Sequence, residues 1–343
     1  MDFLEHTKVK WSYVTHLVDP SLAAGVAPVG SEPDAGALVL GRVAVIGKNK
    51  EIEDQRGRRV TLFPGDVIAG ALGYRYATDQ YEGVPVAGGA IGHLLGQGGV
   101  CGEILSKNER MPDATTLEWI GRLTDRDGTP LHLRRFARRP RRPAAAPRPR
   151  TLLVVCASMD AGKTTTAAQA ICCLSRRGHR VSAAKITGTA CRKDPGMMED
   201  AGAIRVLDFT YCGFPSTAHL PASDLLGIAA DLRTFLLEDE PEFLVYEIAD
   251  GILQRETRIL LESPEFHDTI DAVVYAAPES PSCETGVRRL RAWGYNVVAV
   301  AGAVANSRLG MVEAREAAGV PCLNGAMLLD GALLRALQPA SVA

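Results

Sequence analysis

The stretch Cys156-Ala-Ser-Met-Asp-Ala-Gly-Lys163-Thr164 decides the fold of the second half of this chain. It follows an apolar run, Leu152-Leu-Val-Val, that has the character of a buried strand. It precedes Thr165-Thr-Ala-Ala-Gln-Ala-Ile-Cys-Cys-Leu, which has the spacing of an amphipathic helix. A Gly-Lys-Thr sequence between a strand and a helix is the context of a phosphate-binding loop, where successive amides and the positive helix end face the phosphates.

Each position of this loop has an expected role. Lys163 is predicted to reach the β and γ oxygens of a nucleoside triphosphate, and the Thr164 hydroxyl to bind Mg²⁺. Ala157 stands where the pattern G-x-x-x-x-G-K-[ST] has its first glycine, and alanine fits there if its φ is negative. The alternative is a chance Gly-Lys-Thr at an ordinary helix start. The predicted cofactor-binding residues of the loop are Ser158, Met159, Asp160, Ala161, Gly162, Lys163, Thr164 and Thr165.

A second acidic element follows in Phe243-Leu-Val-Tyr-Glu247-Ile-Ala-Asp250-Gly251. The apolar run predicts a strand that delivers Glu247 at its carboxyl end, the edge at which ligands of open α/β sheets bind. Glu247 is therefore expected to bind the metal ion or its water. Asp250 and Gly251 are expected to make a turn, with an alternative in which Asp250 only caps the next helix.

The whole second half alternates apolar and amphipathic segments. Near-continuous apolar strands separated by helices predict a mostly parallel sheet covered by helices on both faces. The expected strands are 151–157, 181–187, 204–209, 243–249, 271–277 and 296–302, and the expected helices are 164–177, 222–237, 283–292 and 309–318.

The first 137 residues show a different pattern of apolar and turn-forming residues. Short apolar runs such as 37–46 and 59–63 alternate with Gly, Pro and Asp turn signals, which predicts a small all-β barrel or sandwich. A glycine-rich stretch between Gly88 and Gly102 suggests a second nucleotide loop, but its spacing misses G-x-G-x-x-G and turns of the β domain explain it better.

An Arg-, Pro- and Ala-rich stretch from Arg134 to Arg150 separates the two halves and predicts an extended linker. The alternative is a nucleic-acid-binding arm, although only Phe136 offers a stacking ring. The expected domains are therefore 1–137, a linker at 138–150, and a phosphate-loop domain at 151–343.

Composition narrows the classes of function. The 343 residues carry a formal net charge of −2, which gives no global attraction to nucleic acid or to an anionic membrane. The sequence has neither a signal-like N-terminus nor an apolar run long enough to cross a bilayer, so we expect a cytoplasmic protein. Its eight cysteines are then expected to be reduced thiols.

The second half resembles the dethiobiotin synthetase, cobyrinate amidase and molybdopterin-guanine dinucleotide protein B group of phosphate-loop proteins. The resemblance is carried by Gly-Lys163-Thr164-Thr-Thr-Ala, by Lys185 in Ala-Ala-Lys-Ile-Thr-Gly-Thr, and by the Glu247-Ile-Ala-Asp-Gly segment. It covers residues 151–302. Ile248 and Asp250 replace glycines of that group's turn. The resemblance implies a dimeric enzyme that uses ATP, or GTP, with Mg²⁺ to activate a carboxylate- or phosphate-like group, and it places base recognition near Asn306.

Phosphoryl transfer depends on positioning and on charge stabilisation, so cations near the γ-phosphate matter most. Lys185, at the end of a central strand, is the leading candidate, with a structural ion pair as the alternative. Asp208 is a candidate base or metal-side acid. The expected catalytic residues are Lys163, Lys185, Asp208 and Glu247, and the expected substrate-side residues are Thr187, Gly188, Thr189, Asp250 and Arg255.

Three functions are compatible with these patterns. The first is an ATP-dependent small-molecule kinase or ligase, and the second is a nucleotide-switched binding or delivery protein. The third is a polynucleotide-directed NTPase that uses the Arg-rich linker. The expected partners are a nucleoside triphosphate, a small-molecule substrate and a second copy of the chain, with neither a membrane nor a nucleic acid among the favoured ones.

Overall fold

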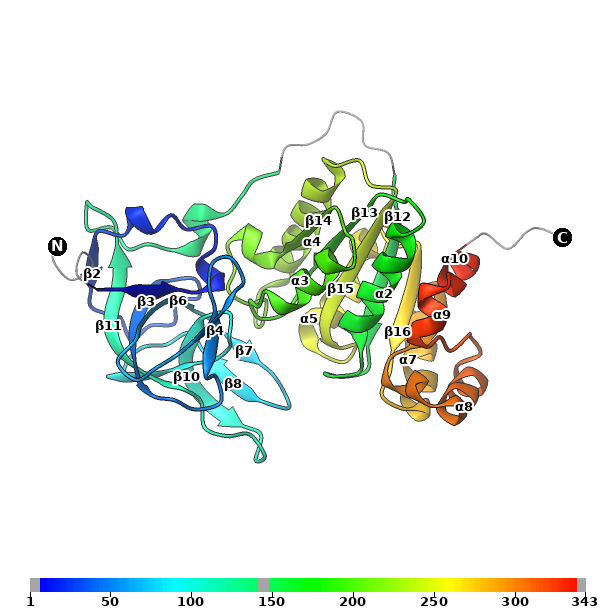
Figure 1. The fold of residues 1–343 in the computed structure, drawn as a ribbon, viewed down its shortest axis with the longest axis horizontal. Helices are drawn as coiled ribbons and strands as arrows, with labels where there is room; N and C mark the ends of the chain where they lie inside the picture. The colour runs from blue at the N-terminus through cyan, green and yellow to red at the C-terminus, as the bar shows by residue number, and fades with distance from the viewer. Residues whose placement is uncertain (1–6, 141–147, 338–343) are drawn as a thin grey trace. The chain divides into compact units, whose positions relative to one another are not determined.

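The computed structural model describes residues 7–140 and 148–337, which divide into two compact units (Figure 1). The first, here called the barrel unit, comprises the chain up to Arg139 together with residues 189–193 and 209–219. The second, here called the sheet unit, comprises residues 140–188, 194–208 and those from Leu220 onward. Two short segments from the second half of the sequence are thus part of the first unit.

Five strands of the barrel unit form a closed ring of pairings. β3 pairs with β6 and β11, β9 pairs with β11 and β10, and a parallel pairing of β10 with β6 closes the ring. Alternate inward side chains, among them Val39, Ile68 and Leu117, form its core. The strands are β1 (Val9–Trp11), β2 (Gly25–Ala27), β3 (Leu38–Val45), β4 (Glu51–Glu53), β5 (Arg59–Thr61), β6 (Val67–Leu72), β7 (Arg75–Tyr76), β8 (Tyr81–Val84), β9 (Ile91–Leu94), β10 (Val100–Lys107) and β11 (Thr116–Thr124).

Short 3-10 helices join these strands. They are η1 (Tyr13–Thr15), η2 (Pro20–Leu22) and η3 (Leu133–Phe136), with η4 (Phe209–Cys212) in the second inserted segment. The glycine-rich stretch from Gly88 to Gly102 spans β9 and the turn into β10, so strands rather than a helix surround it.

The Arg- and Pro-rich stretch is shorter as a connector than the sequence predicts. Its first part belongs to the barrel unit: η3 includes Arg134, whose guanidinium lies 5.1 Å from the centre of the Phe214 ring. Its last residue, Arg150, already begins a strand of the sheet unit. Cation–π stacking orders the first residues of this stretch and strand pairing orders its last one, and the linker expected at 138–150 stays a prediction. Residues 141–147 lie outside the described residues.

The sheet unit is built on six parallel strands in the order β14-β13-β15-β12-β16-β17. This confirms the predicted parallel sheet of an α/β fold. The strands are β12 (Arg150–Cys156), β13 (Val181–Lys185), β14 (Arg205–Asp208), β15 (Phe243–Gly251), β16 (Ala272–Ala276) and β17 (Val297–Ala301). The helices are α2 (Lys163–Ser175), α3 (Lys193–Asp200), α4 (Ala222–Leu237), α5 (Arg255–Leu261), α6 (Pro264–His267), α7 (Ser280–Ala292), η5 (Ala303–Asn306), α8 (Arg308–Ala318), α9 (Gly325–Leu329) and α10 (Ala332–Leu337).

Side-chain alternation along the strands assigns helices to both faces of this sheet. Leu152 and Val154 of β12 form one hydrophobic cluster with Ile171 of α2 and Leu328 of α9. On the other face, α7 packs against the ring of Tyr275 in β16, so closely that a Cβ on Gly286 would lie 2.0 Å from that ring. Both faces of the strands are thus buried, which explains their near-continuous apolar sequences. Across residues 7–140 and 148–337, no helix combines the length and the apolar character that spanning a membrane requires.

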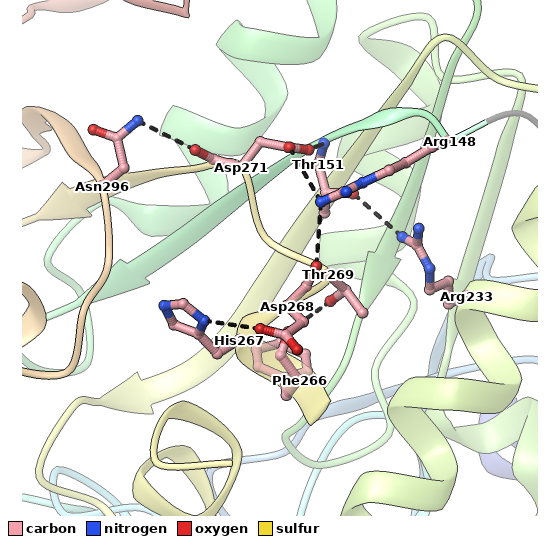
Figure 2. Close-up of polar contacts among 9 residues, drawn as sticks. All are labelled: Arg148, Thr151, Arg233, Phe266, His267, Asp268, Thr269, Asp271 and Asn296. Carbon is pink, nitrogen blue, oxygen red and sulfur yellow. Dashed lines mark hydrogen bonds and ion pairs between the residues drawn. The ribbon is translucent and has the colours of Figure 1, made fainter. Parts of the chain in front are cut away.

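A polar network fixes the start of β12, at the end of the sheet opposite the Gly-Lys-Thr loop (Figure 2). The carboxylate of Asp271 accepts a hydrogen bond from the Thr151 amide at 2.7 Å, and the Thr151 carbonyl accepts one from the Asp271 amide at 3.0 Å. Arg233 of α4 donates to the Thr151 hydroxyl at 3.3 Å, and Asn296 donates to the Asp271 carbonyl. The network therefore links the start of β12 to α4 and to Asp271, the residue that precedes β16.

Replacing Asp271 by alanine should lower the free energy of unfolding by about 1–2 kcal/mol, since the buried Thr151 amide would lose its side-chain acceptor. Asp271→Asn keeps a carbonyl oxygen and should cost clearly less. Urea denaturation of the two variants measures this difference. Equal losses would contradict the assigned hydrogen bond.

Candidate functional site

The Gly-Lys-Thr loop connects the carboxyl end of β12 to the first turn of α2. Gly162, the residue before the helix, has φ +94°, a left-handed conformation that favours glycine. Asp160 also has a positive φ, 57°. Ala157 is absent from the positive-φ residues, so alanine replaces the first glycine of the motif without strain.

The amides of this loop are available as donors. Those of residues 158–165 donate no hydrogen bond to any other residue in the described ranges. The carbonyl of Gly162 instead accepts from the Thr166 amide at 3.0 Å and from the Thr166 hydroxyl at 2.9 Å, which starts the helix. A row of free amides at a helix N-terminus, with Lys163 as its first residue, is an arrangement that binds anions.

Close backbone approaches hold the loop in shape. A Cβ on Gly251 would lie 2.1 Å from the Ala157 carbonyl oxygen, and one on Gly302 would lie 2.1 Å from the Ala161 carbonyl oxygen. The Cys156 thiol donates to the carbonyls of Ser158 and Asp250. Burial raises the pKa of this thiol to about 12, so it remains neutral and acts as a structural donor.

Thr164 and Glu247 meet beneath the loop. The Thr164 hydroxyl donates a hydrogen bond to Glu247 Oε1 at 2.8 Å. Glu247 is fully buried on β15, opposite Val154 of β12 and Lys185 of β13 in the strand register. The other oxygen, Glu247 Oε2, is buried and has no hydrogen-bond partner among the described residues. A buried carboxylate oxygen without a partner is costly, so this position demands an explanation.

Charges around Glu247 partly compensate its burial. Burial raises the pKa of Glu247, and the ammonium of Lys185 opposes this effect. Lys185 is itself buried and forms an ion pair with Asp194, in the first turn of α3. The carboxyl ends of β13 and β15 therefore carry a buried lysine and a buried acid, and α3 adds the partly exposed carboxylate of Asp194.

The donors in this cluster fit a magnesium ion. Mg²⁺ prefers oxygen ligands, and the carboxylate of Glu247 and the hydroxyl of Thr164 supply them beside the row of free loop amides. The orphaned Glu247 Oε2 is the observation in favour of a cation there. Groups of three or more His, Cys, Asp or Glu side chains suited to a metal are absent from the described part of the chain, so an ion would need the phosphates as further ligands.

A cavity of about 230 Å³ adjoins the loop. Its lining includes Gly162, Thr165 and Gln169 from the start of α2, together with Asn306 and Asn324. Asn306 is exposed, and the Asn324 side chain caps α9 by accepting from the Met327 amide at 3.0 Å. The cavity thus places the predicted Asn306 beside the loop, with two further amide side chains that the sequence did not indicate.

Of the predicted substrate residues that follow β13, two belong to the sheet unit and one to the barrel unit. The Thr187 hydroxyl accepts from the Ala249 amide at 2.9 Å, so it joins the strand ends of β13 and β15. Gly188 has φ +135°, and a Cβ there would lie 3.1 Å from the Lys185 side chain. Thr189 belongs to the barrel unit, where it forms a bridge with Ser216.

The remaining predicted residues have varied surroundings. Asp208 is buried and lies opposite Lys185 in the register of β14 and β13. Asp250 has φ +60° and lies within β15, and the neighbouring Gly251 pairs with Cys156. The predicted turn at these two residues is wrong, because a bulge in the pairing lets the strand continue. Arg255 donates to the Leu220 carbonyl at 2.9 Å.

The alternative role of Asp250, a cap for the next helix, is not seen. α5 begins at Arg255, and its N-cap residue is Gln254. The most important residue that the sequence analysis missed is Asp194. It lies in the short polar helix α3, which lacks the apolar periodicity that identified the other helices.

Comparisons with known proteins give only loose likenesses. No protein-family model matches this sequence, and no curated protein matches it either. Signal recognition particle 54 kDa protein from Aeropyrum pernix in complex with GDP aligns at 18% identity and a TM-score of 0.37, over 57% of this chain and 49% of that chain. Less than half of that protein's length is therefore matched.

Two receptor structures give similar values. Signal recognition particle receptor FtsY from Elizabethkingia anophelis aligns at 16% identity and a TM-score of 0.37, over 57% of this chain and 67% of that one. Cell division protein FtsY from Thermotoga maritima aligns at 15% identity and a TM-score of 0.35, over 59% and 70%. Likenesses this loose assign no activity to the chain, and none of them supports the resemblance to the dethiobiotin synthetase group.

Gly251→Ala should destabilise the protein by about 2 kcal/mol, because its Cβ would overlap the backbone of Ala157 and the strand must shift. Gly227→Ala is a matched control: Gly227 lies inside α4, and a Cβ there would meet open space, with no atom of another element within 4 Å. That control should stabilise by about 0.5–1 kcal/mol through helix propensity. Thermal denaturation compares them, and a Gly251→Ala variant as stable as the control would rule out the close contact.

Proposed function

We propose that the sheet unit binds a nucleoside triphosphate with Mg²⁺ and cleaves or transfers its γ-phosphoryl group. The observation that carries this proposal is the pairing of the Thr164 hydroxyl with the buried Glu247, one of whose oxygens has no partner among the described residues. An acid buried at this point destabilises the free protein, so a ligand that completes its coordination is the physical reason to keep it.

We assign different roles to the residues of the loop and to those beside it. The free amides of residues 158–165 and the ammonium of Lys163 would hold the phosphates, and Thr164 and Glu247 would hold the magnesium ion. A bound magnesium ion would neutralise the charge that develops on the phosphoryl oxygens. The cavity beside Gly162 would receive the base, with Asn306, Asn324 and Gln169 as its amide groups.

The finer proposal is a kinase or ligase that activates a carboxylate- or phosphate-like group. Lys185 supports it, because a buried lysine at the carboxyl end of β13, one strand in from the edge of the sheet, is placed to stabilise an anionic acceptor. Asp208 lies opposite it on β14. Incubation with ATP or GTP, Mg²⁺ and a metabolite extract, followed by mass spectrometry, would identify a compound that gains a phosphoryl group.

Lys163→Ala should reduce nucleotide turnover at least about 100-fold, because a preorganised cation beside the phosphates is lost. Arg176→Ala, which removes a cation from the other end of the same helix, is the control and should leave turnover unchanged. Binding of fluorescent ATP and GTP analogues and release of phosphate in the presence of Mg²⁺ give the two readouts. Wild-type turnover by Lys163→Ala would overturn the site.

A second candidate function is a nucleotide-switched binding or delivery protein. It is favoured by the division of the chain: the segments that leave β13 and β14, residues 189–193 and 209–219, belong to the barrel unit. A change at the strand ends would therefore reach that unit through a few bonds of chain. The polynucleotide reading is weakened, because Arg134 and Arg138 stack on aromatic rings of their own unit.

Lys185→Met separates transfer from switching. If Lys185 stabilises a reacting acceptor, turnover should fall about 100-fold while the nucleotide dissociation constant changes by no more than about threefold. Single-turnover kinetics and equilibrium titration measure the two quantities. Unchanged turnover together with a partner that binds only one nucleotide state would favour the switch.

A further inference from the structure

An open apolar groove of the sheet unit is lined by residues of α8, of α9 and of the segment that joins them (Figure 1). This groove, here called the α8–α9 groove, has a volume of about 640 Å³, and its apolar lining includes Met311, Val312, Val320 and Met327. Val312 and Met327 are 39% and 38% exposed. Methionine side chains are flexible and polarizable, so they adapt to the shape of a bound surface. Exposed apolar residues that gather in one groove are typical of an interaction site.

Two arginines accompany the apolar lining. Arg308 and Arg315 both line the groove and are seven residues apart on α8, which places them about 10 Å apart along nearly the same side of the helix. Neither guanidinium forms an ion pair or a hydrogen bond with another residue of 7–140 or 148–337. Glu313 of the same helix accepts from the Ser280 hydroxyl at 3.1 Å, and no acid of the described ranges lines the groove. The groove therefore matches a molecule that is both apolar and negatively charged.

The edge of the sheet beside the groove is already paired. The amide of Val300 in β17 donates to the Pro321 carbonyl at 2.9 Å, and the Val300 carbonyl accepts from the Leu323 amide at 2.9 Å. Cys322, which lies between these two partners, forms a parallel bridge with Val300. A ligand that adds a β-strand needs free backbone groups at an edge, and here the chain itself has taken them. An amphipathic helix needs only an apolar groove, so a helix is the peptide conformation that fits.

The charge of this surface also distinguishes between a different protein and a second copy of the chain. A two-fold contact brings the same residues of both copies together, so the guanidinium groups of Arg308 and Arg315 would meet those of the other copy. Like charges that face each other across an interface cost free energy. A helix with carboxylates two turns apart would instead pair with both arginines while its apolar side chains enter the groove.

We propose that the α8–α9 groove binds an acidic amphipathic helix of a partner protein. Apolar side chains at positions i, i+3 or i+4, and i+7 of that helix pack on Met311, Val312 and Met327, and its Asp or Glu side chains pair with Arg308 and Arg315. The groove contains none of the loop residues 158–165. The proposal is therefore independent of whether the sheet unit cleaves a nucleoside triphosphate.

A phage-displayed library of helical peptides about four turns long, selected on the full-length protein, tests this proposal. Enriched sequences should combine apolar residues at helical spacing with Asp or Glu. One of them, synthesised with a fluorescent label, gives a dissociation constant by anisotropy. Arg308→Glu combined with Arg315→Glu should weaken its binding at least about tenfold, because two attractive charge pairs become repulsive. Val312→Glu should also weaken it at least about tenfold, because binding would bury an unpaired charge.

The matched control is Arg110→Glu combined with Arg126→Glu, which changes the net charge equally. Both arginines are exposed in turns of the barrel unit. This control should bind the peptide as tightly as the wild type does. Added salt should weaken binding to the wild type and should affect the Arg308 and Arg315 double variant less, since screening acts on the charge pairs. Thermal denaturation of each variant verifies that it folds, and the arginine variant suffices if Val312→Glu does not.

Three results would overturn the proposal. The first is a selection that enriches no peptide, or only neutral and basic ones, or one whose peptides bind the arginine variant as tightly as the wild type. The second is a dimer in sedimentation velocity that Val312→Glu dissociates, which would assign the groove to a second copy. The third is flotation with phosphatidylglycerol vesicles that is lost in Leu309→Glu, which would assign this face to a lipid surface, since Leu309 is 78% exposed at the start of α8.

Discussion

The burial of one carboxylate, Glu247, constrains the whole carboxyl end of the sheet. Its position on β15 between β12 and β13 leaves it no solvent, and burial raises its pKa. Among the residues that the structure describes, one hydrogen bond reaches this carboxylate, from Thr164, and the ammonium of Lys185 opposes the effect of burial. These groups compensate the carboxylate only in part, which is typical of a site prepared for a ligand rather than of a core built for stability. The close backbone contacts at Gly251 and Gly302 leave the loop little freedom, so its donors are already organised in this structure.

The chain passes between the two compact units just after the strand ends that carry Lys185 and Asp208. β13 and β14 end in Lys185 and Asp208, and the segments that follow them are parts of the barrel unit. Within that unit, the carboxylate of Glu53 on β4 accepts hydrogen bonds from the amides of Arg192 and Lys193.

The sequence by itself determined the succession of strand, Gly-Lys-Thr loop and helix, the parallel sheet, and the placement of Glu247 on a strand, because each depends on local spacing and on apolar runs of regular length. It placed the helix at 222–237 with the bounds that the structure has. It failed where spacing carries no signal. α3 is short and polar, and the continuation of β15 through Asp250 and Gly251 depends on a bulge in its pairing with β12.

Only the tertiary structure decided which distant residues meet. The ion pair of Lys185 with Asp194, the cavity that joins Gly162 to Asn324, and the hold of Glu53 on residues 192 and 193 all arise from contacts between separate elements. Periodicity tells which face of an element is buried, but it does not tell which partner will cover that face. The partner is chosen by packing of the whole chain, in which a buried charge must find its donors.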